Sequence, residues 1–127
     1  MMTPSQVGSV TEAQILAALV SRGMNVLVPF SPMPYDLVAE KDGKFQRVQC
    51  KTGALRDGVI VFKDYSDDHE SYRGLVDVIA VYCPQNGKIY WIALDKVEGG
   101  MQHLRIDPPK NGQRKKIRFA KDFELGL

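Results

Sequence analysis

The dipeptide Asp42-Gly43 lies between two segments, 35–41 and 44–52, in which apolar and polar residues alternate. A two-residue Asp-Gly connection is a strong short-range signal of a β-hairpin, because both turn residues need a backbone with positive φ. Alternation with a period of two is typical of a strand that is buried on one face. We therefore expect an antiparallel hairpin, and its turn fixes which residue lies opposite which.

The expected register brings three polar side chains to one face of the hairpin. A two-residue turn pairs Lys41 with Lys44, which places Asp36 opposite Gln49. Lys51 follows Gln49 by two residues and therefore lies on the same face. An ordinary surface Asp–Lys pair beside a polar glutamine explains this pattern equally well. The other face is apolar and is expected to face the core; it carries Leu37, Ala39, Val48 and Cys50.

A helix is expected before this hairpin, and mainly strands after it. Residues 9–22 predict the helix, with Ser9 or Thr11 as its N-cap and Gly23 at its end. The order of elements favours a mixed α/β (α+β) fold. The length suits one domain, residues 1–127. The further expected strands are 24–30, 58–63, 76–83 and 88–94, the last two joined around Asn86-Gly87, with short edge strands at 104–106 and 116–119 and a helical turn at 95–98.

Glu12 is a charged residue on the apolar side of the expected helix. At 100° per residue it lies within the stripe formed by Ile15, Leu16, Leu19 and Val20. Burying an unpaired carboxylate is costly, so Glu12 needs a cation or a position at the rim of the core. A favourable interaction with the helix N-terminus is the alternative.

The composition excludes several classes of protein. Hydrophobic residues make up 44% and charged residues 25% of the 127 residues, which is wrong for a disordered chain. Two cysteines do not make a disulfide framework, and the scattered Cys and His residues show no zinc spacing. Neither a signal peptide nor an apolar run of membrane-spanning length is recognisable. We expect a cytoplasmic protein with no membrane partner.

The small net charge of +2 conceals an uneven distribution. Residues 99–127 carry seven basic and three acidic residues, and the basic segment 110–121 is a candidate for contacting phosphates. A solvated tail is the alternative. The candidate DNA-binding residues are Arg47, Arg56, Lys110, Arg114, Lys115, Lys116 and Arg118.

The polar residues of the hairpin and the helix suit metal-assisted hydrolysis. The side-chain oxygens of Asp36, Gln49 and Glu12, with the backbone carbonyl of Cys50, suit a hard cation such as Mg²⁺, or Mn²⁺ in its place. Such an ion activates water and stabilises charge on a phosphoryl group. Lys51 can orient the water or stabilise the transition state. The neutral Gln49 predicts weaker metal binding than a carboxylate.

Pro34-Tyr35-Asp36, twelve further residues, and then Gln49-Cys50-Lys51 resemble the spaced motif of the PD-(D/E)XK nuclease superfamily. Glu12 matches the glutamate that many members carry on the preceding helix. Gln49 departs from the usual Asp or Glu. The Gln form resembles a branch that includes an intron-encoded homing endonuclease of cyanobacteria. The segments 8–13, 47–52 and 76–84 are similar to that branch.

This resemblance implies a restriction-endonuclease-like core, with a central mixed β-sheet flanked by helices and the site on the hairpin. It implies Mg²⁺-dependent cleavage of double-stranded DNA, site-specific in the manner of homing or restriction enzymes, by a homodimer or homotetramer. Asp36 would be the principal metal ligand and Gln49 the second. Glu12 would bind directly or through water, and Lys51 would be the catalytic lysine. The alternatives are a structure-specific nuclease, such as a Holliday-junction resolvase, and a non-catalytic DNA-binding module with a decayed site.

Overall fold

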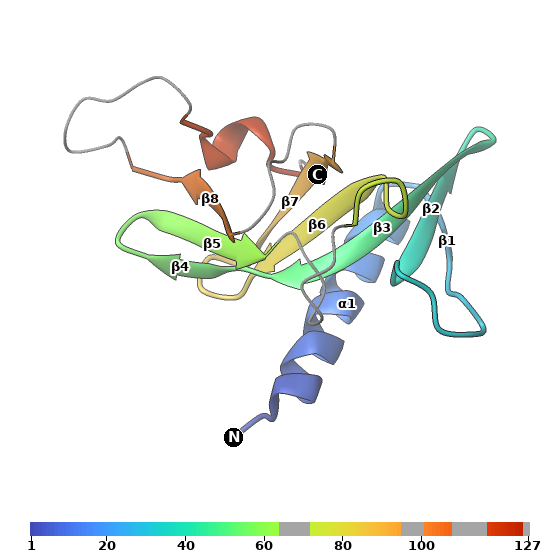
Figure 1. Cartoon of the computed structure of the whole chain (residues 1–127), viewed down its shortest axis with the longest axis horizontal. Helices are drawn as coiled ribbons and strands as arrows, with labels where there is room; N and C mark the ends of the chain where they lie inside the picture. The colour runs from blue at the N-terminus through green and yellow to red at the C-terminus, as the bar shows by residue number, and fades with distance from the viewer. Residues whose placement is uncertain (64–71, 95–100, 108–116, 126–127) are drawn as a thin grey trace.

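The computed structural model describes residues 1–63, 72–94, 101–107 and 117–125. One α-helix precedes the strands, and a short 3-10 helix follows them (Figure 1). The elements are α1 (Pro4–Ser21), β1 (Asn25–Leu27), β2 (Leu37–Lys41), β3 (Lys44–Thr52), β4 (Ala54–Arg56), β5 (Val59–Lys63), β6 (Val78–Cys83), β7 (Lys88–Ala93), β8 (Met101–Arg105) and η2 (Ala120–Asp122).

Helix α1 begins five residues earlier than the sequence analysis predicted. Thr3 is its N-cap, since the Thr3 hydroxyl accepts a hydrogen bond from the backbone N–H of Gln6 at 3.2 Å. The backbone N–H of Thr3 donates in return to the Gln6 side chain at 2.8 Å, which completes a capping box. Pro4 at the first helical position suits a helix start because its missing N–H is not needed there. The prediction that Ser9 or Thr11 caps the helix was therefore wrong.

The buried stripe of α1 is narrower than expected. Ile15 and Leu19 are fully buried, and Thr11 lies one turn before Ile15 on the same side. Leu16 and Val20, which were predicted to face the core, are 36% and 53% exposed. The buried side of the helix is thus rotated toward Thr11.

The predicted hairpin and its register are confirmed. Strands β2 and β3 pair antiparallel, with Lys41 opposite Lys44. Asp42 and Gly43 both have positive φ, 53° and 80°, as the two-residue turn requires. The hairpin belongs to a five-stranded sheet of order β1-β2-β3-β6-β7, in which β3 and β6 are parallel and the other neighbours antiparallel. The sheet is therefore mixed, as predicted.

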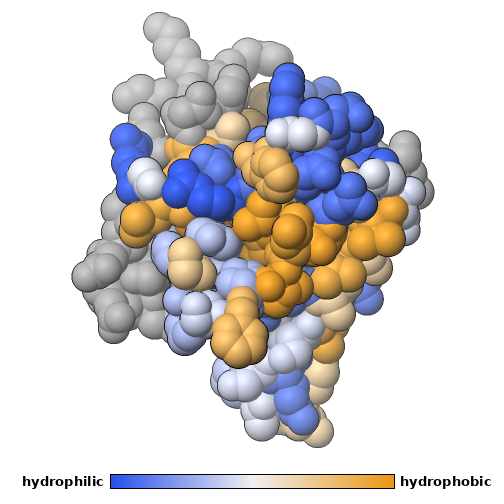
Figure 2. Space-filling model, turned by 90° about the vertical axis from the view of Figure 1, so that its right-hand side faces the viewer, coloured by the Kyte–Doolittle hydropathy of each residue, from blue (hydrophilic) through white to orange (hydrophobic). Residues whose placement is uncertain are grey.

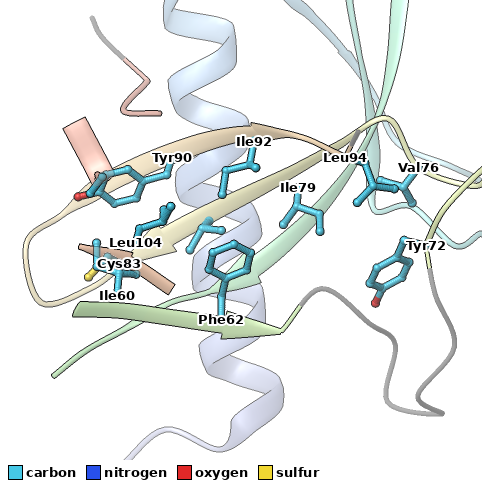
Figure 3. Packing of buried hydrophobic residues seen from close by; sticks show 12 residues of the cluster. Ile60, Phe62, Tyr72, Val76, Ile79, Cys83, Tyr90, Ile92, Leu94 and Leu104 are labelled. Carbon is cyan, nitrogen blue, oxygen red and sulfur yellow. The ribbon is translucent and has the colours of Figure 1, made fainter. Parts of the chain in front are cut away.

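The two faces of this sheet are covered differently. Helix α1 packs on one face, where Ile15 and Leu19 meet Val48 and other buried residues of the sheet. The opposite face packs against a small sheet of order β4-β5-β8 (Figures 1 and 3), with Ile60 among the residues in between. In the part of the chain that the structure describes, the second covering layer is thus formed by strands rather than by a helix. Since side chains alternate along a strand, Gln49 and Lys51 project on the side away from α1.

Other expectations were confirmed with changed bounds. Strand β1 is only three residues long rather than spanning 24–30, and Pro29 lies in the loop that follows. The hairpin around Asn86-Gly87 has a four-residue connection, because Cys83 pairs with Lys88. Of the strand predicted at 116–119, Phe119 forms an isolated bridge to Arg105. The helical turn predicted at 95–98 lies outside the described residues. Within those residues, no helix has the length and apolarity to cross a membrane.

Candidate active site

Asp36 is held at the point where β2 and β3 separate. Its backbone N–H donates to the Val48 carbonyl at 2.9 Å, and since Val48 is the register partner of Leu37, the regular pairing ends at Leu37. Its carboxylate Oδ2 accepts a hydrogen bond from the backbone N–H of Cys50 at 2.8 Å. The carboxylate therefore takes the place of a strand partner and is fixed at the edge of β3. The predicted pairing of Asp36 with Gln49 lies just beyond the paired residues, and Asp36 bonds to Val48 and Cys50 instead.

Glu12 lies at the rim of the buried side of α1, not at its centre as predicted. The hydroxyl of the neighbouring Thr11 is 2.6 Å from the hydroxyl of Thr52, which ties this turn of the helix to the end of β3. Glu12 lies more than two turns inside α1, so an interaction with the helix N-terminus does not explain it. The rim position, one of the two predicted solutions, is thus the one adopted.

The two carboxylates influence each other. Partial burial raises the pKa of Asp36 above its ordinary value, and the Cys50 N–H and the Lys51 charge only partly oppose this. Partial burial, and then the negative charge of Asp36, raise the pKa of Glu12. Both groups therefore lie in a place where negative charge is unfavourable without an added cation.

Gln49 and Cys50 bring two further oxygens to this edge. Gln49 is half-buried, and its side chain has no hydrogen-bond partner among the residues that the structure describes. Because the N–H and C=O of one strand residue point to the same edge, the Cys50 carbonyl faces the side on which Asp36 lies. The Cys50 thiol is buried, and burial together with Asp36 and Glu12 raises its pKa strongly. The thiol therefore stays protonated, and only the carbonyl suits a metal ion.

Lys51 projects from the same face and contacts a residue that the sequence analysis did not select. Its ammonium donates a hydrogen bond to the hydroxyl of Tyr72 at 2.9 Å. Tyr72 is 21 positions further along the chain, beyond the hairpin, and is buried. No local pattern connects the two residues, since their contact depends on how the chain returns to the sheet before β6.

The donor set of this site suits Mg²⁺ better than a soft metal. Within the described residues, no group of three or more His, Cys, Asp and Glu side chains is gathered to hold an ion. Mg²⁺ is commonly bound by one or two protein carboxylates, with waters and substrate phosphate as its other ligands. Asp36 and Glu12 are the two carboxylates that could fill this role, with the amide oxygen of Gln49 and the carbonyl of Cys50 as candidates for further ligands.

The candidate DNA-binding residues are less completely placed. Arg47 forms an ion pair with Asp77, with 3.0 Å between Nη2 and Oδ1, so a phosphate would share this guanidinium with Asp77. Arg56 ends β4 and is exposed. Arg118 precedes the bridge at Phe119, and its carbonyl accepts from the N–H of Arg105. The other four candidates, Lys110, Arg114, Lys115 and Lys116, lie outside the described residues.

Comparison with known proteins gives two matches. A family profile described as PD-(D/E)XK endonuclease matches residues 2–126. The solved structure of a bacterial homing endonuclease, I-Ssp6803I, superimposes with a TM-score of 0.75 at 19% identity, over 98% of this chain and 88% of the other. At that identity the likeness shows a shared fold. No curated protein sequence matches significantly.

Proposed function

The chain belongs to the PD-(D/E)XK endonuclease family, and on this premise we propose that it hydrolyses phosphodiester bonds in double-stranded DNA with Mg²⁺ as cofactor. Mn²⁺ serves in its place. The homing endonuclease that shares the fold favours cleavage at specific sites over a structure-specific activity. The observation that carries the proposal is the fixed Asp36 carboxylate, 2.8 Å from the Cys50 N–H and close enough to Glu12 to raise its pKa.

Each residue of the site has a role that its position allows. Asp36, at the end of the hairpin, would hold the ion with the oxygens of Gln49 and Cys50, and Glu12 would bind it directly or through water. When bound, the ion acts as a Lewis acid that activates water and stabilises charge on the phosphoryl group. Lys51 supplies a positive charge next to this position, where it orients the attacking water and stabilises the transition state.

An apolar surface supports action as a homo-oligomer. Leu27, Val28, Phe30 and Met33 follow one another along β1 and the next loop, and all are exposed. Figure 2 shows apolar side chains gathered on the side of the molecule that carries β1 and β2. Large exposed apolar areas mark interaction sites. One small domain cleaves one strand, so a second copy on this side would bring a second site to the other DNA strand.

The cleavage test compares the wild type with Lys51→Ala on a pooled library of random DNA duplexes in Mg²⁺. The wild type should cut a restricted set of sequences, and EDTA should stop it. Lys51→Ala should bind DNA and fold normally but cut at least about 10³-fold more slowly. Full activity in Lys51→Ala would remove this lysine from the mechanism. A strong preference of the wild type for four-way junctions would replace site-specific cleavage by junction resolution.

The oligomer test is sedimentation of the wild type and Phe30→Ser. The wild type should sediment as a dimer or tetramer, and the variant as smaller species. A wild-type monomer at micromolar concentration would contradict the oligomer.

A further inference from the structure

We propose that Tyr72 is a positioning residue for Lys51, and that its hydroxyl sets the rate of cleavage by fixing the direction of the Lys51 ammonium. The proposal rests on the proposed function for its effect on rate. The contact itself is the hydrogen bond of 2.9 Å from Lys51 Nζ to Tyr72 Oη. The ammonium is also 5.0 Å from the centre of the Tyr72 ring, which is consistent with a contact at the hydroxyl end.

The Tyr72 side chain is firmly held. It is 6% exposed, and its ring belongs to the buried cluster that also contains Val76 and Leu94. Figure 3 shows its ring beside these two residues, with the hydroxyl directed away from them. The Tyr72 carbonyl accepts from the N–H groups of Leu75 and Val76, both at 3.0 Å. The hydroxyl is therefore presented by a ring whose position is set by packing and by a tight turn.

The turn after Tyr72 is attached to the same strand that carries Lys51. The Arg47 guanidinium donates to the Gly74 carbonyl at 3.2 Å and to both carboxylate oxygens of Asp77. The backbone N–H of Asp77 donates to the Arg47 carbonyl at 2.9 Å. Residues 72–77 thus contact β3 at Arg47 and at Lys51, which fixes the Tyr72 hydroxyl relative to the strand.

A lysine gains most from such a partner because its side chain is long and flexible. The ammonium has three donors and no acceptor, so a bond to one hydroxyl oxygen defines where the other two N–H groups point. Fixing the ammonium before the substrate binds removes an entropic cost from the reaction. The phenol is neutral, so it orients the positive charge without cancelling it. Asp or Glu at this position would instead neutralise Lys51.

The kinetic test is Tyr72→Phe, which removes only the hydroxyl. We expect kcat for DNA cleavage to fall about 10- to 100-fold, with KM and Mg²⁺ dependence unchanged. Tyr90→Phe is the matched control, because Tyr90 is also buried, with 1% of its surface exposed against 6% for Tyr72. Its hydroxyl accepts a hydrogen bond from the Asn86 side chain at 2.9 Å, away from Lys51. The control should retain wild-type kcat. Wild-type kcat in Tyr72→Phe, or an equal loss in both variants, would overturn the role in rate.

A second measurement tests the positioning without any cleavage. Nitrogen-detected NMR of the lysine ammonium groups should show a slowly exchanging Lys51 signal in the wild type and in Tyr90→Phe. In Tyr72→Phe this signal should exchange much faster. Equal exchange in all three proteins would disprove the positioning itself. If the wild type does not cleave DNA, the proposed function fails, and the ammonium signal still decides whether Tyr72 holds Lys51.

Discussion

Two aspartates lie against the same strand, β3, in opposite electrostatic situations. Asp77 accepts hydrogen bonds from the backbone N–H and the guanidinium of Arg47, and these bonds lower its pKa. Asp36 accepts one bond from the Cys50 N–H, and burial raises its pKa. The charged form of Asp77 is thus favoured by folding, whereas the charged form of Asp36 is disfavoured.

This difference separates a structural carboxylate from a functional one. The pair of Asp77 and Arg47 joins β3 to the start of β6. The pKa values of Asp36 and Glu12 are both raised, because negative charge is unfavourable where these carboxylates lie. A bound divalent cation would stabilise their charged forms. The pKa shift of Asp77 is that of a carboxylate that stabilises the fold, whereas the shift of Asp36 is consistent with the proposed role in metal binding.

The largest expected effect separates the two aspartates by activity. Asp36→Asn keeps an oxygen for the Cys50 N–H but removes the charge, so cleavage in Mg²⁺ should fall about 10³-fold or more. Asp77→Asn keeps a side-chain oxygen for Arg47 and so keeps the turn that carries Tyr72 in place; it should cleave within about 3-fold of the wild type at 20 °C, a temperature chosen to keep both variants folded. Rates on one DNA duplex check this, with circular dichroism as the control. Similar losses in the two variants would erase the distinction.

The second largest effect distinguishes Asp36 from Asp77 by metal binding. Mg²⁺ is expected to bind only the folded state. At a Mg²⁺ concentration of about ten times its Kd, the unfolding temperature of the wild type should rise by about 5 °C. Asp77→Asn should show the same increase and Asp36→Asn almost none. Thermal unfolding with and without EDTA measures it. An undiminished increase in Asp36→Asn would place the ion elsewhere.

A smaller effect concerns stability without metal. In EDTA, Asp77→Asn should lower the unfolding temperature by about 3 °C, because it breaks a partly exposed ion pair. Asp36→Asn should leave it unchanged or raise it, since an unfavourable charge is removed. The idea that Asp36 is dispensable for folding would be refuted if Asp36→Asn were the less stable variant.

The smallest effect is the opposite pH dependence of the two aspartates. The folded pKa of Asp77 is below 3.8, so its stabilisation is present above that pH and is lost as the pH falls through the folded pKa. The folded pKa of Asp36 is above 3.8, so its contribution is present below that pH and is lost as the pH rises through the folded pKa. Unfolding temperatures in EDTA across pH 3 to about 7 check this. On acidification, the unfolding temperature of the wild type should fall relative to that of Asp77→Asn and rise relative to that of Asp36→Asn. Parallel profiles would contradict it.

The parts of the site that depend on short-range rules could be predicted from the sequence. The turn at Asp42-Gly43 fixes the register of β2 and β3 as far as Leu37 and Val48, whereas Asp36 lies just beyond the paired residues. The start of α1 also depends on a short-range rule, because Thr3 and Gln6 form a capping box. Ser9 and Thr11 have side chains that suit an N-cap, but they lie inside the helix.

The remaining parts depend on tertiary structure. Leu16 and Val20 continue the apolar stripe in sequence, yet they stay exposed because α1 packs through Thr11, Ile15 and Leu19. The contact of Tyr72 with Lys51 arises from the path of the chain between β5 and β6, which no local periodicity encodes.

The most direct test of the account is where a divalent ion binds on β3. Mn²⁺ is paramagnetic, so a titration followed by amide NMR identifies the residues nearest to the ion. The account predicts that the signals of Asp36, Gln49 and Cys50 broaden first, and that Asp36→Asn abolishes the effect while Asp77→Asn preserves it. Broadening that begins at Asp77 and Arg47, or that persists in Asp36→Asn, would contradict the assignment of this site.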